Sequence, residues 1–262
     1  MQIGVNTWVW VSPLTDDAIP ALAGRAAALG FDLLELPLET LDGYDPVRAR
    51  SVLEEQGLAA SSTLVFPPDR DLIHPEQGPR ENAARYIRGA IDVAATLGSR
   101  TLSGPLFASV GRSWLQSPAE RERDLERLVD ALVPLARHAA DLGVRLGLEP
   151  LNRFETSFVN LASQAIEIVD RVASPGLGIL LDTFHMNIEC ENDRGAPGSG
   201  HVGWLDVADA LRAIGYQGPV VIESFTAQVK AIARAAAVWR PVAESQDALA
   251  AEGCAFLRGL LR

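Results

Sequence analysis

Three carboxylates each follow a short apolar run of the kind that forms a buried strand: Glu149, Asp182 and Glu223. Because the active site of a parallel barrel lies at the carboxyl ends of its strands, we expect these groups to lie close together. A carboxylate held there must be paired, protonated or bound to a metal, since a bare buried charge is costly. Few basic residues stand nearby in the sequence. A divalent cation is therefore the simplest partner, and three carboxylates suit Mn²⁺ or Mg²⁺.

Each of these residues also has a purely structural alternative. A single strand-end Glu is more often a helix cap or half of a surface ion pair, and only the recurrence at three strand ends favours a functional site. His185, three residues after Asp182, is a further candidate, although a lone His also serves as a hydrogen-bonding group in protein cores. Trp8 and Phe66 lie at the end of expected strands, where they pack in the core or line the apolar side of a pocket.

The elements that must position these residues alternate between short β-like runs and longer helical stretches. Strands are expected over residues 3–8, 32–36, 59–66, 100–103, 145–151, 177–183 and 219–225. Helices are expected over residues 16–29, 45–56, 80–97, 118–142, 163–172 and 205–214, and the C-terminal region is mostly helical. Several helices end at a Gly, which can adopt the left-handed conformation that closes a helix.

This alternation predicts an α/β fold with a parallel sheet covered by helices, and repeated βα units over this length favour a (β/α)₈ TIM barrel. A doubly wound open sheet is the alternative, but the chain has no Gly-x-Gly-x-x-Gly and no P-loop pattern. No linker or composition break interrupts residues 1–262, so a single barrel domain is expected. Only seven strands are counted, one fewer than a closed barrel needs.

Composition excludes several classes of protein. The chain has 262 residues, 48% of them hydrophobic and 22% charged, as in an ordinary globular protein. The net charge of −11 argues against a nucleic-acid partner or an anionic membrane. Two cysteines imply no disulfide framework, and neither a signal peptide nor a membrane span is visible, so a cytoplasmic location is expected.

Four stretches of sequence carry a resemblance to a known family. Residues 149–155 read Glu-Pro-Leu-Asn-Arg-Phe-Glu, and residues 181–189 read Leu-Asp-Thr-Phe-His-Met-Asn-Ile-Glu. Residues 191–200 hold an Arg-Gly-x-Pro-Gly-x-Gly loop, and residues 214–225 end in Val-Val-Ile-Glu-Ser-Phe. With these stretches the chain resembles the sugar isomerase/epimerase barrels of the xylose isomerase-like superfamily. Within it, the D-tagatose, D-psicose and L-ribulose 3-epimerases are the most similar group.

The resemblance implies an isomerase that epimerises free ketoses at C3 through an enediolate, using Mn²⁺ or else Co²⁺ or Mg²⁺. The family binds its metal through Glu, Asp, His and Glu at four strand ends. Glu149, Asp182 and Glu223 match the three acids, and Glu149 and Glu223 also match the catalytic acid/base pair. The residues that match the sugar-binding positions, or that could line the sugar's apolar side, are Glu155, His185, Arg194, Trp8 and Phe66.

The chain departs from the family pattern where the strand count falls short. The family's metal-binding His corresponds to Ile188, and one βα unit is missing between Glu189 and Cys190. The pattern does not distinguish a deletion in the protein from a segment absent from the printed sequence. If the deletion is real, the metal loses its imidazole ligand.

Other functions stay open or are excluded on the same residues. A hydroxypyruvate- or inosose-type isomerase of the same superfamily would share the metal-binding acids, and a catalytically inactive sugar- or metal-binding homologue would fit the missing His. An abasic-site endonuclease needs many His ligands and a basic DNA-binding face, which four His and the acidic charge oppose. The expected partner is a small-molecule sugar, and the resemblance implies a homodimer or homotetramer.

Overall fold

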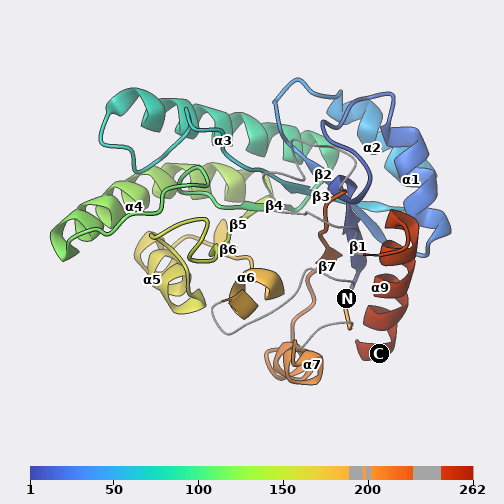
Figure 1. Cartoon of the computed structure of the whole chain (residues 1–262). Coiled ribbons are helices and arrows are strands. Elements are labelled where there is room, and N and C mark those ends of the chain that lie inside the picture. Colours follow the sequence, from blue (N-terminus) through green and yellow to red (C-terminus); the bar gives the residue numbers. More distant parts are fainter. Residues whose placement is uncertain (189–196, 199–201, 227–242, 262) are drawn as a thin grey trace. The chain divides into compact units, whose positions relative to one another are not determined.

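The computed structural model describes residues 1–188, 197–198, 202–226 and 243–261. By their internal contacts, the residues form two compact units. Figure 1 labels the helices and strands of both units. Unit 1 comprises Met1–Pro37, Asp42–Ser61 and Glu191–Arg262, and unit 2 comprises Leu38–Leu41 and Ser62–Cys190.

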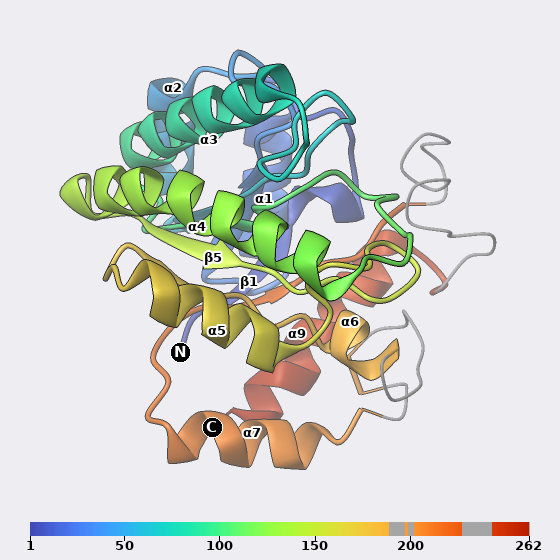
Figure 2. The ribbon, with the colours of Figure 1, turned by 90° about the vertical axis from the view of Figure 1, so that its left-hand side faces the viewer.

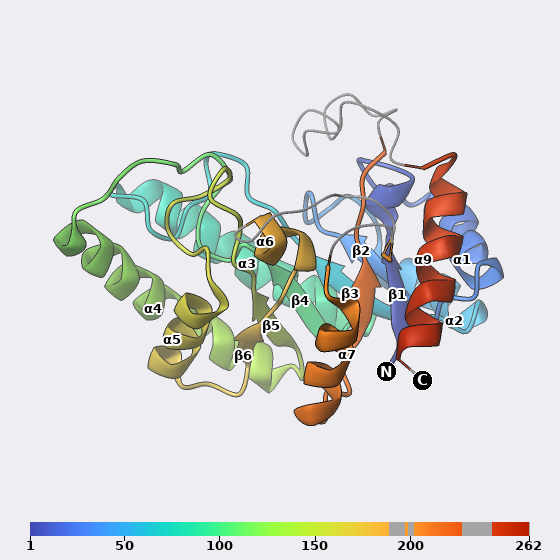
Figure 3. The ribbon, with the colours of Figure 1, turned by 60° about the horizontal axis from the view of Figure 1, so that its bottom comes forward.

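Unit 1 is built on parallel strands in the order β7-β1-β2, namely β1 (Ile3–Asn6), β2 (Leu33–Pro37) and β7 (Val220–Ile222). Its helices are η1 (Thr7–Val9), α1 (Ile19–Ala28), α2 (Pro46–Glu55), α7 (Trp204–Ala213) and α9 (Gln246–Leu260). The C-terminal helix α9 packs against β1 and β7 (Figure 3). Helix α2 begins where the Asp45 side chain accepts hydrogen bonds from the backbone N–H groups of Val47 and Arg48.

Unit 2 holds parallel strands in the order β3-β4-β5-β6, with the first residues of β3 belonging to unit 1. These strands are β3 (Ala59–Thr63), β4 (Thr101–Gly104), β5 (Arg145–Leu148) and β6 (Leu177–Ile179). The helices are α3 (Gln77–Leu97), α4 (Pro118–Asp141), α5 (Ala162–Val172) and the short α6 (Thr183–Ile188). Helices α3, α4 and α5 lie side by side in chain order (Figure 2).

Local sequence explains where the long helices of unit 2 begin and end. Ser117 and Glu120 form a reciprocal capping box at the start of α4, followed by Pro118 at the first helical position. Helix α3 ends at Gly98, whose φ of 82° is the left-handed conformation expected of a Gly after a helix. Apolar side chains of α3 and α4, among them Ile87, Ile91 and Leu128, are fully buried.

The predicted α/β class with parallel strands is confirmed, and seven strands are present among the described residues. The observed strands are shorter than expected at their carboxyl ends, because residues after Leu148, Ile179 and Ile222 form loops or turns instead of ladders. Helix α6 was not expected, since its six residues show no apolar period. The junction at Glu189 and Cys190 lies outside the described residues.

The single domain over residues 1–262 stays a prediction. A search of the described helices found none with the length and apolar character needed to cross a bilayer.

Candidate active site

Glu149 stands at the point where β5 ends. Its backbone N–H donates to the carbonyl of Gly104, the last residue of β4, over 3.0 Å, and the residue is 7% exposed. Gly104 has a φ of 139°, and a Cβ there would lie 2.1 Å from the carbonyl oxygen of Leu64. The close backbone approach therefore requires a Gly beside Glu149.

Asp182 begins the turn that carries His185. One carboxylate oxygen, Oδ1, accepts a hydrogen bond from the Phe184 N–H over 2.7 Å, and the Asp182 carbonyl accepts from the Met186 N–H over 3.0 Å. These bonds start α6 directly after β6, as short Asp side chains commonly do at helix starts. His185 then lies about one helical turn after Asp182, on the same side of the helix.

Glu149, Asp182 and His185 converge within unit 2. Their potential ligand atoms all lie within 4.8 Å of one another. The Nε2 atom of His185 is 3.7 Å from Oε1 of Glu149 and 3.6 Å from Oδ2 of Asp182, too far for direct hydrogen bonds. The carboxylate oxygens of Glu149 and Asp182 also lie within 4.8 Å of each other, close enough for both carboxylates to reach one divalent cation.

The contacts of the other ring nitrogen of His185, Nδ1, indicate which nitrogen carries the proton. Its Nδ1 accepts the backbone N–H of Asn152 over 3.1 Å, and the Asn152 side-chain Nδ2 lies 2.9 Å away. A neutral imidazole has one N–H, so the ring proton is on Nε2, which faces the two carboxylates. A metal-binding His instead donates its second N–H to an acceptor. His185 is thus arranged as a hydrogen-bond donor beside the carboxylates and not as a metal ligand.

The loop after β5 is held together by its own side chains. Asn152, 1% exposed, donates from Nδ2 to Oε1 of Glu155 over 2.9 Å and accepts the Phe154 N–H over 2.9 Å. Asn160 donates to the carbonyls of Leu151 and Thr156 over 2.8 and 2.9 Å. The structure therefore joins two sequence-predicted residues, Glu155 and His185, through Asn152.

A second loop, between β4 and α4, braces the first. The Gly111 N–H donates to the Glu155 carbonyl, and the Ser157 N–H donates to the Arg112 carbonyl, each over 2.8 Å. The Arg112 guanidinium is buried, 3.4 Å from Asp71 and 2.5 Å from Asp124. This ion-paired side chain fixes the loop onto α4.

The remaining predicted residues lie in both units or outside the described chain. In unit 1, Glu223 follows β7 and is exposed, while Trp8 is 4% exposed with its ring centroid 5.8 Å from that of Phe225. In unit 2, Phe66 is 5% exposed and meets Tyr86 edge to face at 6.3 Å. Arg194 lies outside the described residues. The roles predicted for these four residues stay predictions.

Sequence reasoning missed two residues of interest. Asn152 lies inside the recognised Glu-Pro-Leu-Asn-Arg-Phe-Glu stretch, so its motif could have suggested a role. Glu35 is a carboxyl inside the apolar run Leu33-Leu-Glu-Leu36, and a charge at such a place is itself a signal.

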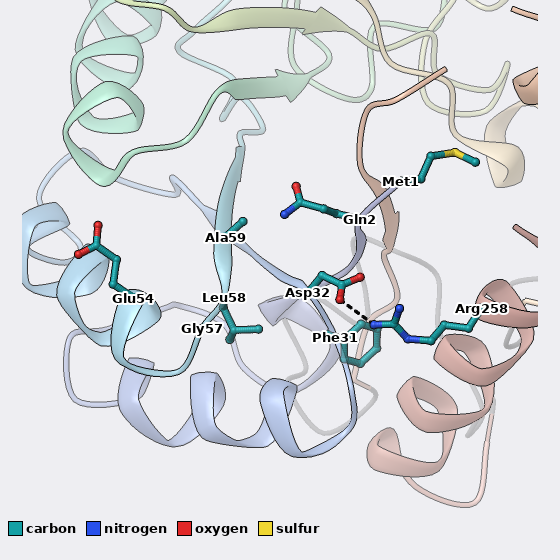
Figure 4. A pocket seen from close by; sticks show the side chains of 9 residues that line it. All are labelled: Met1, Gln2, Phe31, Asp32, Glu54, Gly57, Leu58, Ala59 and Arg258. Carbon is teal, nitrogen blue, oxygen red and sulfur yellow. Dashed lines mark hydrogen bonds and ion pairs between the residues drawn. The ribbon is translucent and has the colours of Figure 1, made fainter. Parts of the chain in front are cut away.

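Unit 1 also has an open hollow at the amino ends of its strands (Figure 4). Two of its charged groups, Arg258 and Asp32, pair with each other. Arg258 pairs with Asp32 over 2.8 Å, and Asp32 also accepts the Ile3 N–H over 2.9 Å. The hollow lies at the opposite strand ends from Glu223, so it is a poor candidate for the chemistry predicted above.

Comparisons with known proteins agree with these features. A model of the family described as "Xylose isomerase-like TIM barrel" matches residues 23–196. A ketose 3-epimerase of Arthrobacter globiformis is 32% identical, with 100% of this chain and 97% of that protein covered. A probable ketose 3-epimerase of Synechocystis sp. is 32% identical, with 98% and 96% covered. The solved structure of D-psicose 3-epimerase with D-tagatose from Clostridium cellulolyticum has a TM-score of 0.90 at 26% identity, with 100% of both chains covered.

The alignment lengths bear on the missing βα unit. The Arthrobacter alignment spans 283 positions against the 262 residues of this chain, so at least 21 positions of that relative have no counterpart here. The Synechocystis alignment spans 278 positions and leaves at least 16 unmatched. Both show that these relatives have positions that this chain lacks, and the expectation that they form one βα unit after Glu189 stays a prediction.

Proposed function

The chain belongs to the xylose isomerase-like TIM barrel family, and we propose that it is a metal-dependent epimerase that inverts free ketoses at C3. The expected isomerase class is confirmed by relatives named ketose 3-epimerases. The observation that carries the proposal is the convergence of Glu149, Asp182 and the donor His185 in one cluster.

The cluster fits a divalent cation through its carboxylates. Glu149 and Asp182 would hold the ion, with Glu223 as the third carboxylate predicted from the sequence. A set of oxygen ligands suits Mn²⁺ or Mg²⁺, and we propose Mn²⁺, with Co²⁺ as a further choice from the family. When bound, such an ion polarises the ketose carbonyl and so acidifies the proton at C3.

The protein's own groups then carry the proton. A proton next to a carbonyl is a weak acid, so a carboxylate must remove it while the developing enediolate oxygen is stabilised. The proposal assigns removal and return of the C3 proton to Glu149 and Glu223, one on each face of the sugar. General acid–base help of this kind contributes about 10²–10⁴-fold.

His185 and Glu155 would position the ketose at the O1 and O2 end. The Nε2–H of His185 points away from Asn152 and toward the carboxylate cluster, so it can donate to a sugar oxygen that enters there. Glu155 is held by the Asn152 amide and offers its carboxylate to a sugar hydroxyl. Arg194, Trp8 and Phe66 complete the predicted sugar contacts.

The test is proton exchange at C3. Folded protein is loaded with Mn²⁺ and incubated with a panel of free ketoses in D₂O, and deuterium is located by NMR. We expect incorporation at C3 together with the epimer. Glu149→Gln should lower the rate by about 10²-fold or more. Glu54→Gln, on a side chain that is 63% exposed on α2, is the matched control and should leave the rate unchanged.

Each other outcome would replace the proposal with a defined alternative. No exchange with any ketose, from folded and metal-loaded protein, would favour the inactive sugar- or metal-binding homologue. Exchange at another carbon would favour a hydroxypyruvate- or inosose-type isomerase. Full activity in Glu149→Gln would remove Glu149 from the proton transfer. We also propose, from the family, a homodimer or homotetramer and a cytoplasmic location.

A further inference from the structure

A buried carboxyl outside the predicted site stands in the middle of β2. Glu35 is 7% exposed and lies between Asn6 of β1 and Ser61 of β3. The Asn6 Nδ2 donates to its Oε1 and the Ser61 hydroxyl to its Oε2, each over 2.9 Å. Asn6 and Ser61 are themselves 0% and 1% exposed. Among the described residues, Glu35 has no cationic partner.

This environment favours the neutral acid. Burial raises the pKa of the Glu35 carboxyl, and the hydrogen bonds from Asn6 and Ser61 offset this only in part. The neutral acid must place its own O–H on an acceptor, and the Ser61 oxygen can take it, because a hydroxyl both donates and accepts. Glu35 is therefore held by the hydrogen bonds from Asn6 and Ser61 and not by an ion pair among the described residues.

Glu35 is one of two groups that orient the Asn6 amide. With Nδ2 held by Glu35, the Oδ1 of Asn6 faces η1 and accepts the Trp8 N–H over 2.8 Å. This bond caps η1, the turn that carries Trp8. An inverted amide would set its NH₂ group against the Trp8 N–H, so Glu35 and the Trp8 N–H both favour the present orientation. Loss of Glu35 removes one of these two supports and leaves the Asn6 NH₂ group without its acceptor.

Asn6 and Glu35 lie at the same position along the strands as Glu223. Asn6 pairs with Glu35 in the β1–β2 register, and Val5 pairs with Ile222 in the β1–β7 register, so Asn6 is level with Glu223. Paired residues of parallel strands point to the same face of a sheet, about 4.8 Å apart per strand. The Trp8 ring also packs on Phe225, two residues beyond Glu223.

We infer that Glu35 is a positioning residue, which holds the Asn6 amide and through it the Trp8–Phe225 pair beside Glu223. The effect on catalysis rests on the proposed function, in which Trp8 and Glu223 belong to the sugar site. The effect on the position of the Trp8 ring does not rest on the proposed function, so the effect on Trp8 and the effect on catalysis can be measured separately.

The experiment compares Glu35→Leu, Glu35→Gln and Leu34→Ala in the full chain. Gln keeps an acceptor for Asn6 and can donate to the Ser61 oxygen, whereas Leu fills the space without any hydrogen bond. Leu34 is 0% exposed in the same strand and faces the opposite side, so its truncation destabilises β2 without touching the network. The protein is labelled with 5-fluorotryptophan, and the Trp8 ¹⁹F resonance is assigned with Trp8→Phe.

Glu35→Leu should shift and broaden the Trp8 resonance, while Glu35→Gln and Leu34→Ala should leave it in place. In turnover, Glu35→Leu should lower kcat/KM for the ketose by about 10-fold or more, with Glu35→Gln near wild type. An unchanged Trp8 resonance in Glu35→Leu, with a fall in Tm no different from that of Leu34→Ala, would overturn the inference. So would a Glu35→Gln resonance displaced as far as that of Glu35→Leu. If no variant and no wild type turns over any ketose, the resonance still decides the positioning role, and only the proposed function fails.

Discussion

Arg112 offers the sharpest test of how the loops around the candidate site are held. Its guanidinium is 7% exposed and lies between two buried carboxylates, 3.4 Å from Asp71 and 2.5 Å from Asp124. Arg112→Met keeps an apolar stem and removes the charge. Breaking a buried ion pair from one side costs about 3–5 kcal/mol, because the other charge stays buried and uncompensated.

The structure places the expected loss at the low end of that range. Asp124 keeps two partners without Arg112, since Gln116 donates to it over 2.6 Å and Arg127 over 2.9 Å. Among the described residues, the Asp71 carboxylate keeps only one hydrogen bond, from the Ile73 N–H over 2.8 Å. The Asp71 carboxylate is therefore the main uncompensated charge in the variant. We therefore expect a loss of about 3 kcal/mol. For a chain of this size that lowers Tm by roughly 6–12 °C.

Thermal unfolding followed by circular dichroism measures this effect. Arg50→Met is the matched control, because the Arg50–Glu54 pair has side chains 53% and 63% exposed. The control should change stability by less than about 0.5 kcal/mol. Arg112→Met/Asp71→Asn should be more stable than Arg112→Met alone, since it removes the stranded charge. A Tm for Arg112→Met equal to that of the control would refute the reasoning.

The same variant has a predicted pH dependence. Burial raises the pKa of Asp71, and Arg112 opposes this rise. An acid whose folded-state pKa is raised makes the folded state bind its proton more tightly, so lowering the pH favours folding. Without Arg112 the pKa of Asp71 in the folded state is raised further. The difference in free energy of unfolding between wild type and Arg112→Met should therefore become smaller as the pH falls from about 7 to about 5.

Three further predictions concern other parts of the chain. Gly104→Ala should lose at least ~2 kcal/mol in thermal unfolding, because its Cβ would lie 2.1 Å from the Leu64 carbonyl oxygen. Asp182→Asn should weaken Mn²⁺ binding in calorimetry by more than the ~10–100-fold typical of an outer-shell change, and unchanged affinity would remove Asp182 from the ligand set. Burial raises the pKa of Asp32, but the bonds from Arg258 and the Ile3 N–H outweigh it, so the pKa is lowered overall. The ionised Asp32 carboxylate therefore stabilises the fold, and this contribution is lost as the pH falls through its lowered pKa. Arg258→Met lacks most of this contribution, so its free energy of unfolding should fall less than that of wild type below about pH 4.

The periodic parts of the fold could be predicted from the sequence, and the ends of the strands could not. Helix α3 was expected over residues 80–97 and observed over Gln77–Leu97, since its apolar spacing and the final Gly98 act locally. The strand expected over 145–151 ends at Leu148. Beyond it, Leu151 bonds to Val159 in its own loop instead of to a neighbouring strand. Apolar side chains fill both strands and buried loops, so hydropathy alone does not mark the boundary.

The residues of the cluster could be named from the sequence, whereas the groups that support them could not, and the role of Glu223 stays a prediction. Glu149, Asp182 and His185 could be named because charged or titratable groups interrupt apolar runs at strand ends. The tautomer of His185 depends on the backbone N–H of Asn152, a contact 33 residues distant in sequence, and no residue pattern encodes it. Glu35 escaped notice for a similar reason, since its partners lie on the neighbouring strands β1 and β3.

The arrangement of unit 2 explains how this part of the site is held within a short stretch of the chain. Glu149, Asn152 and Glu155 come from one loop that is closed by its own hydrogen bonds. Asp182 and His185 come from one turn, which the Asp182 carboxylate itself begins. Asn152 joins the loop to the turn, since its backbone N–H and its side-chain Nδ2 both lie against Nδ1 of His185. All of these bonds join residues that precede the junction at Glu189 in the chain, where the sequence predicts a missing βα unit.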